Sequence, residues 1–135
     1  MVRFIIVCIV NGILFGTLDA VINANPFARK LFTVYEPIAK TAINAPAGIV
    51  IDLLYGFVIG FLFLLLYNAL PGDSGIIKGI VFALIIWFFR VLMGVLSSWM
   101  MFTVPVSTLF YVAVTGLFEM FVLGVIYGIF LKPFK

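Results

Sequence analysis

The chain has 135 residues, of which 66% are hydrophobic and 10% are charged, and its formal net charge is +3. A soluble domain carries about 25% charged residues, so this composition excludes an ordinary soluble domain and indicates a membrane protein. The few basic residues are scattered along the chain, which argues against a nucleic-acid partner. We therefore expect the lipid bilayer as its surroundings and no nucleic acid among its partners.

The residue types also limit the chemistry. The chain contains one cysteine, Cys8, and no histidine. These counts rule out an intramolecular disulfide, a histidine metal site and a Ser–His or Cys–His nucleophile pair. Four membrane spans with short connections fill these 135 residues and leave no room for a soluble catalytic domain. We expect a non-enzymatic protein without catalytic residues, cofactor or metal.

The first predicted span runs from residue 2 to about residue 24, long enough to cross the roughly 30 Å hydrocarbon core of a bilayer. A secretory signal peptide is the alternative, because Met1-Val2-Arg3 could form its charged beginning. The apolar stretch is too long for the core of a signal peptide, so we expect a retained helix. Asn11 lies deep in this span and must face protein, whereas Asp19 lies near the far end, within reach of the headgroups.

The connection from about residue 26 to residue 45 is more polar than the spans. Asn25 and Pro26 are typical of a helix start, with an N-cap residue followed by a first-turn proline. Apolar residues then recur at helical spacing, and Pro37 is expected to kink or split the helix. The segment is too short to cross a membrane, so we predict an amphipathic helix in the interface. An ordered loop packed over the bundle is the alternative.

Three further spans are predicted at about residues 47–70, 76–101 and 105–131. Asp52 lies near the start of the second span, and a polar turn at residues 71–75 separates the second span from the third. The predicted fold is therefore a single all-α domain, an integral membrane four-helix bundle. Four crossings place both termini on the same side of the membrane.

Basic residues flank the spans on both sides of the bilayer. The side of the termini holds Arg3, Lys78, Lys132 and Lys135, and the other side holds Arg29, Lys30 and Lys40. The positive-inside rule therefore favours cytoplasmic termini. We expect a multi-pass protein of the plasma (inner) membrane with both termini in the cytoplasm.

Every span carries two small residues four positions apart. These pairs are Gly12/Gly16, Gly56/Gly60, Gly79/Ala83 and Gly124/Gly128. Small residues let helix backbones approach closely, which favours association in lipid, where no hydrophobic effect acts between helices. They predict either a compact bundle or bundles that associate, so we expect a homo-oligomer or a membrane-protein partner.

Two ionisable residues, Arg90 and Glu119, bracket the longest uncharged run, residues 91–118. A charge at mid-bilayer costs about 2.5–3.5 kcal/mol on insertion scales, and an arginine cannot lose its proton to avoid this cost. In an antiparallel hairpin Arg90 is level with Thr115 or Gly116, three to four residues from Glu119. The side chains of Arg90 and Glu119 lean toward each other and close this offset. We predict that Arg90 is buried and paired with Glu119.

Asn11 is a candidate third member of this polar site, and Asp52 is the rival partner of Arg90. Asp52 stands closer to the opposite membrane surface, and its lean and that of Arg90 diverge. We therefore expect Glu119 to be the counter-ion. Such a pair either only joins two helices or forms a functional site, and the sequence leaves both interpretations open.

Two functions fit these observations. The first is a non-enzymatic subunit or scaffold of a membrane assembly, which the absence of catalytic pairs and the small-residue faces slightly favour. The second is an oligomeric small transporter or channel that uses Glu119 and Arg90 as an ion, proton or substrate site. An intramembrane protease with Asp19 and Asp52 as its aspartate pair is the weakest interpretation, because neither residue has a recognisable flanking motif.

Overall fold

The computed structural model describes residues 1–133, and four helical segments in it are long and apolar enough to cross a membrane. They are Val2–Ala24 (α1), Ala45–Leu66 (α3), Gly75–Met101 (α4, η2 and α5) and Val106–Phe130 (α6). Each lies within four residues of the predicted span at both ends. The prediction of an all-α four-helix membrane bundle is confirmed.

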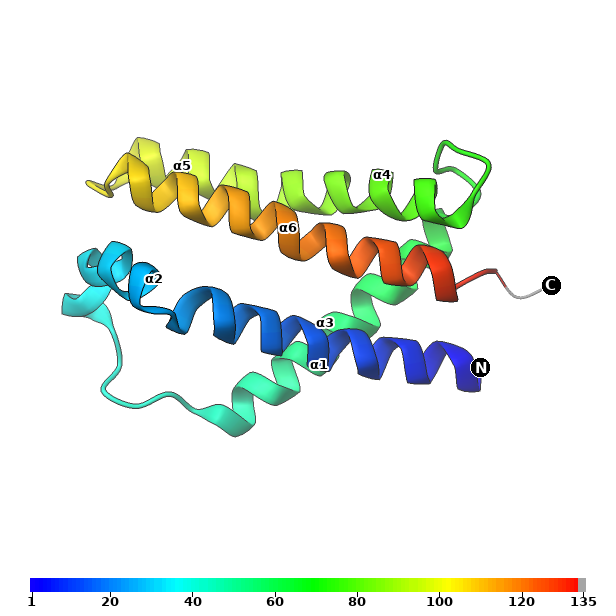
Figure 1. The fold of residues 1–135 in the computed structure, drawn as a ribbon, viewed down its shortest axis with the longest axis horizontal. Coiled ribbons are helices and arrows are strands. Elements are labelled where there is room, and N and C mark those ends of the chain that lie inside the picture. The colour runs from blue at the N-terminus through cyan, green and yellow to red at the C-terminus, as the bar shows by residue number, and fades with distance from the viewer. Residues whose placement is uncertain (134–135) are drawn as a thin grey trace.

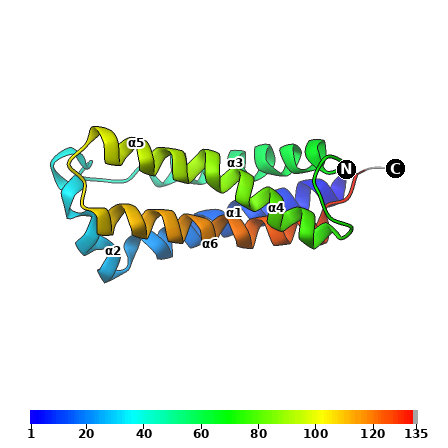
Figure 2. The ribbon, with the colours of Figure 1, turned by 90° about the horizontal axis from the view of Figure 1, so that it is seen from above.

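The helices pack mainly in two pairs, α1 with α3 and α4 with α6, and α1 also contacts α6. Figure 1 shows α6 running alongside α4 and α5, while α3 crosses behind α1 at a steep angle. Met1 and the last turn of α6 lie at one end of the bundle, as an even number of crossings requires. The connection between α1 and α3 lies at the opposite end, beside the turn that joins α5 to α6 (Figures 1 and 2).

The third span is not one regular α-helix. It consists of α4 (Gly75–Trp87), a π-helical turn η2 (Phe88–Leu92) and α5 (Met93–Met101). Single π-helical turns within α-helices are rare and occur frequently at functional sites. Arg90 is the middle residue of this turn, and the sequence analysis did not predict the irregularity.

The connection between the first two spans is helical in its first two thirds. α2 covers Pro26–Leu31 and continues as a 3₁₀-helix, η1, over Phe32–Ile38, whereas residues 39–44 are not helical. These helical turns lie within residues 26–45, where a short interfacial helix was predicted. Pro37 accounts for the early end, because it has no N–H to donate and its ring clashes with the preceding turn.

Asn25 links α1, α2 and α6. Its Oδ1 accepts a hydrogen bond of 2.9 Å from the Ala28 N–H, as predicted for an N-cap. Its Nδ2 donates to the Ile22 carbonyl at 2.8 Å and to the Tyr111 hydroxyl at 3.0 Å. The Tyr111 hydroxyl in turn donates to the Ile22 carbonyl at 2.6 Å. This network fixes the direction in which the chain leaves the membrane.

We expect Asn25→Ala to lower the free energy of unfolding by about 1–2 kcal/mol, because it removes an N-cap together with part-buried hydrogen bonds. Equilibrium unfolding of the purified chain in mixed micelles measures this loss. Asn44→Ala is the matched control, since Asn44 caps α3 through one exposed bond of 3.1 Å to the Ala47 N–H. An equal loss in the Asn44 variant would contradict the role assigned to the Asn25 network.

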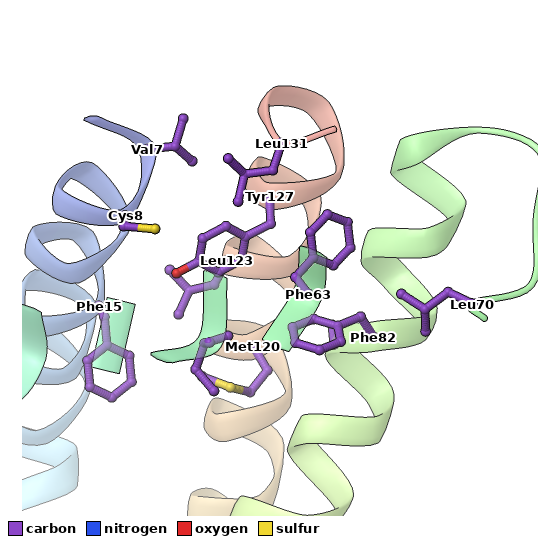
Figure 3. Packing of buried hydrophobic residues seen from close by; sticks show 12 residues of the cluster. Val7, Cys8, Phe15, Phe63, Leu70, Phe82, Met120, Leu123, Tyr127 and Leu131 are labelled. Carbon is purple, nitrogen blue, oxygen red and sulfur yellow. The ribbon is translucent and has the colours of Figure 1, made fainter. Parts of the chain in front are cut away.

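The apolar core lies in the half of the bundle nearest the termini (Figure 3). Phe63 of α3 meets Phe82 of α4 with ring centroids 5.2 Å apart and Tyr127 of α6 at 6.1 Å. The Tyr127 hydroxyl donates to the Gly56 carbonyl at 2.6 Å, which joins α6 to α3. By contrast, no residue of α5 is buried. The bundle is therefore well packed at the end of the termini and more open at the other end.

The small residues of the four spans face one another inside the chain. A Cβ atom added to Gly79 would collide with the Gly124 carbonyl of α6. A Cβ atom added to Gly12 would lie 2.9 Å from the Asp52 carbonyl and 3.0 Å from the Leu53 Cα of α3. The predicted close approach of helix backbones is confirmed, and it joins α4 to α6 and α1 to α3. These glycines are used within the bundle and give no sign of a second copy.

α3 ends at Leu66, four residues before the predicted end of the span. The Lys78 ammonium group donates to the Tyr67 carbonyl at 2.7 Å and to the Leu70 carbonyl at 3.0 Å. It also lies 4.8 Å from the centre of the Tyr67 ring. Basic side chains commonly satisfy carbonyls at helix ends, and the residue before Pro71 is restricted to extended conformations. These two effects end the helix early.

Candidate functional site

The predicted ion pair is present near the middle of two membrane helices. The Arg90 Nη1 atom lies 3.6 Å from the Glu119 Oε2 atom. Among residues 1–133, Glu119 is the carboxylate that pairs with Arg90, and Asp52 does not. The side chain of Val91 packs against Gly116, so the predicted register of the hairpin is also confirmed.

Two aromatic rings support the arginine. The guanidinium carbon of Arg90 lies 4.8 Å from the centre of the Phe15 ring of α1 and 4.9 Å from that of the Tyr55 ring of α3. The two rings stack on each other with centroids 4.5 Å apart and an angle of 20°. Cation–π contacts of this kind contribute about 0.5–2 kcal/mol each. Arg90 is therefore held where all four membrane helices meet.

The prediction that Arg90 is buried is wrong. Its side chain is 31% exposed, whereas that of Glu119 is 4% exposed. The difference arises because Glu119 faces the packed interior from α6, while Arg90 lies where the bundle begins to open toward α5. The Glu119 Oε1 atom is fully buried and has no hydrogen-bond partner among the described residues. The pair thus uses one carboxylate oxygen and leaves the other free.

A cavity of about 330 Å³ lies beside the pair, between α1, η1, η2, α5 and α6. Arg90 and Glu119 line it together with five other polar residues, which are Asp19, Asn23, Tyr35, Ser98 and Thr115. Gly94 forms part of the wall, and a Cβ atom there would have no neighbour within 4 Å. The polar cavity therefore extends from Arg90 and Glu119, near the middle of the last two spans, to the end of α1 and to η1.

Asp19 joins Arg90 and Glu119 in this cavity, as a predicted secondary residue. It is exposed and lies nearer the end of α1, where the Asn23 Nδ2 donates to its Oδ1 at 2.9 Å. The sequence analysis missed Asn23, Tyr35, Ser98 and Thr115 as lining residues. Thr115 had been placed level with Arg90, so the hairpin register was the one signal that pointed to it.

Asn11 is not the third member of the pair. It is completely buried, and its Nδ2 donates to the Leu123 carbonyl of α6 at 3.3 Å, outside the cavity. The prediction placed it beside Arg90, but Asn11 lies four residues from Phe15, which occupies that position on the same helix. The Asn11 Oδ1 atom, like the Glu119 Oε1 atom, has no partner in the described part of the chain.

Asp52 also lies apart from Arg90. Its carboxylate packs against Gly16 of α1, and it lines a separate, mostly apolar cavity between α1 and α3. Asp19 and Asp52 therefore line different cavities. No cluster of three or more metal-ligating side chains is found within residues 1–133.

The arrangement provides one fixed cation and two carboxylates around a polar cavity. Such a set can hold a charged or polar solute, or exchange a proton at Glu119. Comparison with protein-family models, with curated proteins and with solved structures gives no match to this chain.

Proposed function

We propose that this chain is a small membrane transport protein that takes up a solute or ion in the cavity beside Arg90 and Glu119. The observation that carries this proposal is the Glu119 carboxyl group, which lines a polar cavity and has one oxygen, Oε1, buried without a partner among the described residues. Ionisable residues within the membrane are costly and mark substrate or ion pathways. A pair that only joined two helices would require no cavity.

The scaffold interpretation loses part of its support. It relied on small-residue faces that a partner helix could occupy, and those glycines pack against each other within the chain. The polar cavity has no role in a scaffold, whereas a transport protein requires one. We therefore place transport ahead of the scaffold function that the sequence slightly favoured.

We propose further that two or more copies form the working unit. Four helices leave little room for a continuous pathway within one bundle. The side of the bundle formed by α5 has no buried residue, and the cavity is lined from this side by Gly94, Val95 and Ser98. A second copy against α5 would enclose the cavity and complete the pathway.

We place the protein in the plasma (inner) membrane with both termini in the cytoplasm. The support is the positive-inside rule, applied to the end of the bundle that holds Arg3, Lys78 and Lys132. The cavity contains Asp19 and Tyr35 near the opposite end. In this orientation its mouth faces away from the cytoplasm.

Purification without cross-linking, followed by reconstitution into liposomes, tests the proposal. We expect a homo-oligomer that moves small solutes or protons at least tenfold faster than empty liposomes, and Glu119→Gln to abolish this flux. Asp52→Asn is the control and should retain flux, because Asp52 lies outside the cavity. Isolation as part of a stable heteromeric complex, with no flux above that of empty liposomes, would favour the scaffold function instead.

A further inference from the structure

We infer that the solute is a small cation with N–H donors, an ammonium or guanidinium group, bound by the carboxylates of Glu119 and Asp19. This inference rests on the proposed function and specifies the class of substrate. Three properties of the cavity support it: the charges of its lining, their hydrogen-bonding capacity and its size.

The charges around the cavity do not balance. Arg90 contributes one positive charge to the lining, and Asp19 and Glu119 contribute two carboxylates. Arg90 and Glu119 offset each other, so the excess negative charge is that of Asp19, which is exposed and attracts cations to the outer part of the cavity. A monovalent cation neutralises the cavity, whereas an anion would bring a third negative charge.

The free oxygen of Glu119 requires a donor. Arg90 lies against Phe15 and Tyr55 and approaches the Oε2 side of the carboxylate. The Oε1 atom accepts from no group in the described part of the chain, so the carboxylate keeps unused hydrogen-bonding capacity. An ammonium group supplies three N–H donors and a guanidinium group supplies five. Hydrogen bonds between such cations and a carboxylate are about twice as strong as neutral ones.

The dimensions indicate a small solute. The volume of about 330 Å³ is close to the lower limit of about 300 Å³ for ligand pockets, and about twice that of a cavity that holds benzene. Asp19 and Tyr35 line its outer part, and Glu119 lies deeper, near the middle of α6. A cation would meet Asp19 and Tyr35 first, and Glu119 afterwards.

Equilibrium dialysis of the full chain in lipid nanodiscs, with radiolabelled guanidinium and urea at concentrations well below denaturing ones, tests the substrate class. Both molecules are planar, similar in size and carry N–H donors, but urea is neutral because a carbonyl oxygen replaces one amino group. We expect guanidinium to bind at least tenfold more tightly than urea. Tetramethylammonium, a cation without N–H groups, and nitrate, a planar anion, should compete at least tenfold more weakly than unlabelled guanidinium.

Variants assign the binding to the cavity. We expect Glu119→Gln to weaken guanidinium binding at least tenfold and Asp19→Asn to weaken it severalfold, while Asp52→Asn stays within twofold of the natural chain. Because Glu119→Gln alone leaves Arg90 unpaired, the double variant Arg90→Met/Glu119→Gln is measured beside it. It removes both charges, and it should fold and still fail to bind.

The outcomes separate this inference from the proposed function. The inference would be overturned if urea or nitrate bound as tightly as guanidinium. It would also be overturned if the Asp52 and Glu119 variants lost guanidinium affinity to the same extent. Flux of a neutral solute or an anion in liposomes would overturn it as well and leave transport standing. Guanidinium binding without any flux would instead overturn transport, with the cation site retained.

Discussion

Gly79→Val is expected to destabilise the bundle by about 3 kcal/mol or more, or to prevent folding. A side chain at Gly79 would run into the backbone carbonyl of Gly124. Overpacking costs about 1–3 kcal/mol where neighbouring side chains can adjust, but a backbone carbonyl cannot turn aside. The collision is relieved only if α4 moves away from α6, which would separate the whole pair of helices.

Gly94→Val is the matched control, on the same span and again a glycine in a helix. A Cβ atom at Gly94 has no neighbour within 4 Å, so we expect a change of less than about 0.5 kcal/mol. Unfolding in mixed micelles, followed by circular dichroism, measures both variants. Similar losses at the two positions would show that helix propensity, and not the contact between α4 and α6, sets the effect.

Glu119→Gln is the second substitution with a large expected effect. It keeps the shape of the side chain but leaves Arg90 without a counter-ion near mid-membrane. A charge there costs about 2.5–3.5 kcal/mol on insertion scales, and the contacts with Phe15 and Tyr55 compensate for part of this. We therefore expect the free energy of unfolding to fall by about 2 kcal/mol.

The double variant Arg90→Met/Glu119→Gln should recover most of this loss, because no unpaired charge remains. Unfolding of the two single variants and the double variant gives the coupling between the side chains, which we expect to exceed about 1 kcal/mol. Asp19→Asn, which changes an exposed carboxylate in the same cavity, should have little effect on stability. Strictly additive losses would mean that the ion pair does not contribute to the fold.

Part of this architecture could be predicted because the bilayer imposes it. The thickness of the hydrocarbon core sets the length of each span, so continuous apolar runs were enough to locate all four. The turn between α5 and α6 then fixed the register of the hairpin, and with it the pairing of Arg90 with Glu119. The end of α3 was misplaced, because Ala69 and Leu70 extend the apolar run as far as Pro71 and the bonds from Lys78 are not visible in the sequence.

The surroundings of the ion pair could not be predicted. Phe15 and Tyr55 support Arg90, but in a chain with 16 phenylalanines an inward-facing aromatic residue has the same sequence pattern as a lipid-facing one. The cavity lies where α1 and η1 meet the hairpin of the last two spans, and hydropathy carries no information about how closely these segments pack. Asn11 does face α6, but its Nδ2 donates to the Leu123 carbonyl, four residues along α6 from Glu119, and no short turn joins α1 to α6 to fix that level in advance.

The π-helical turn has a consequence for how the third span winds. Gly79, Ala83, Trp87 and Val91 stand four residues apart, and all of them contact or lie against α6. Four residues of a regular α-helix turn about 40° beyond a full circle, so a row of this spacing drifts steadily around the helix. The wider turn at Phe88–Leu92 counteracts the drift and returns Val91 to Gly116. A straight α-helix with the same residues would rotate Arg90 away from Glu119, so the pair depends on a local change of pitch as much as on its two charges.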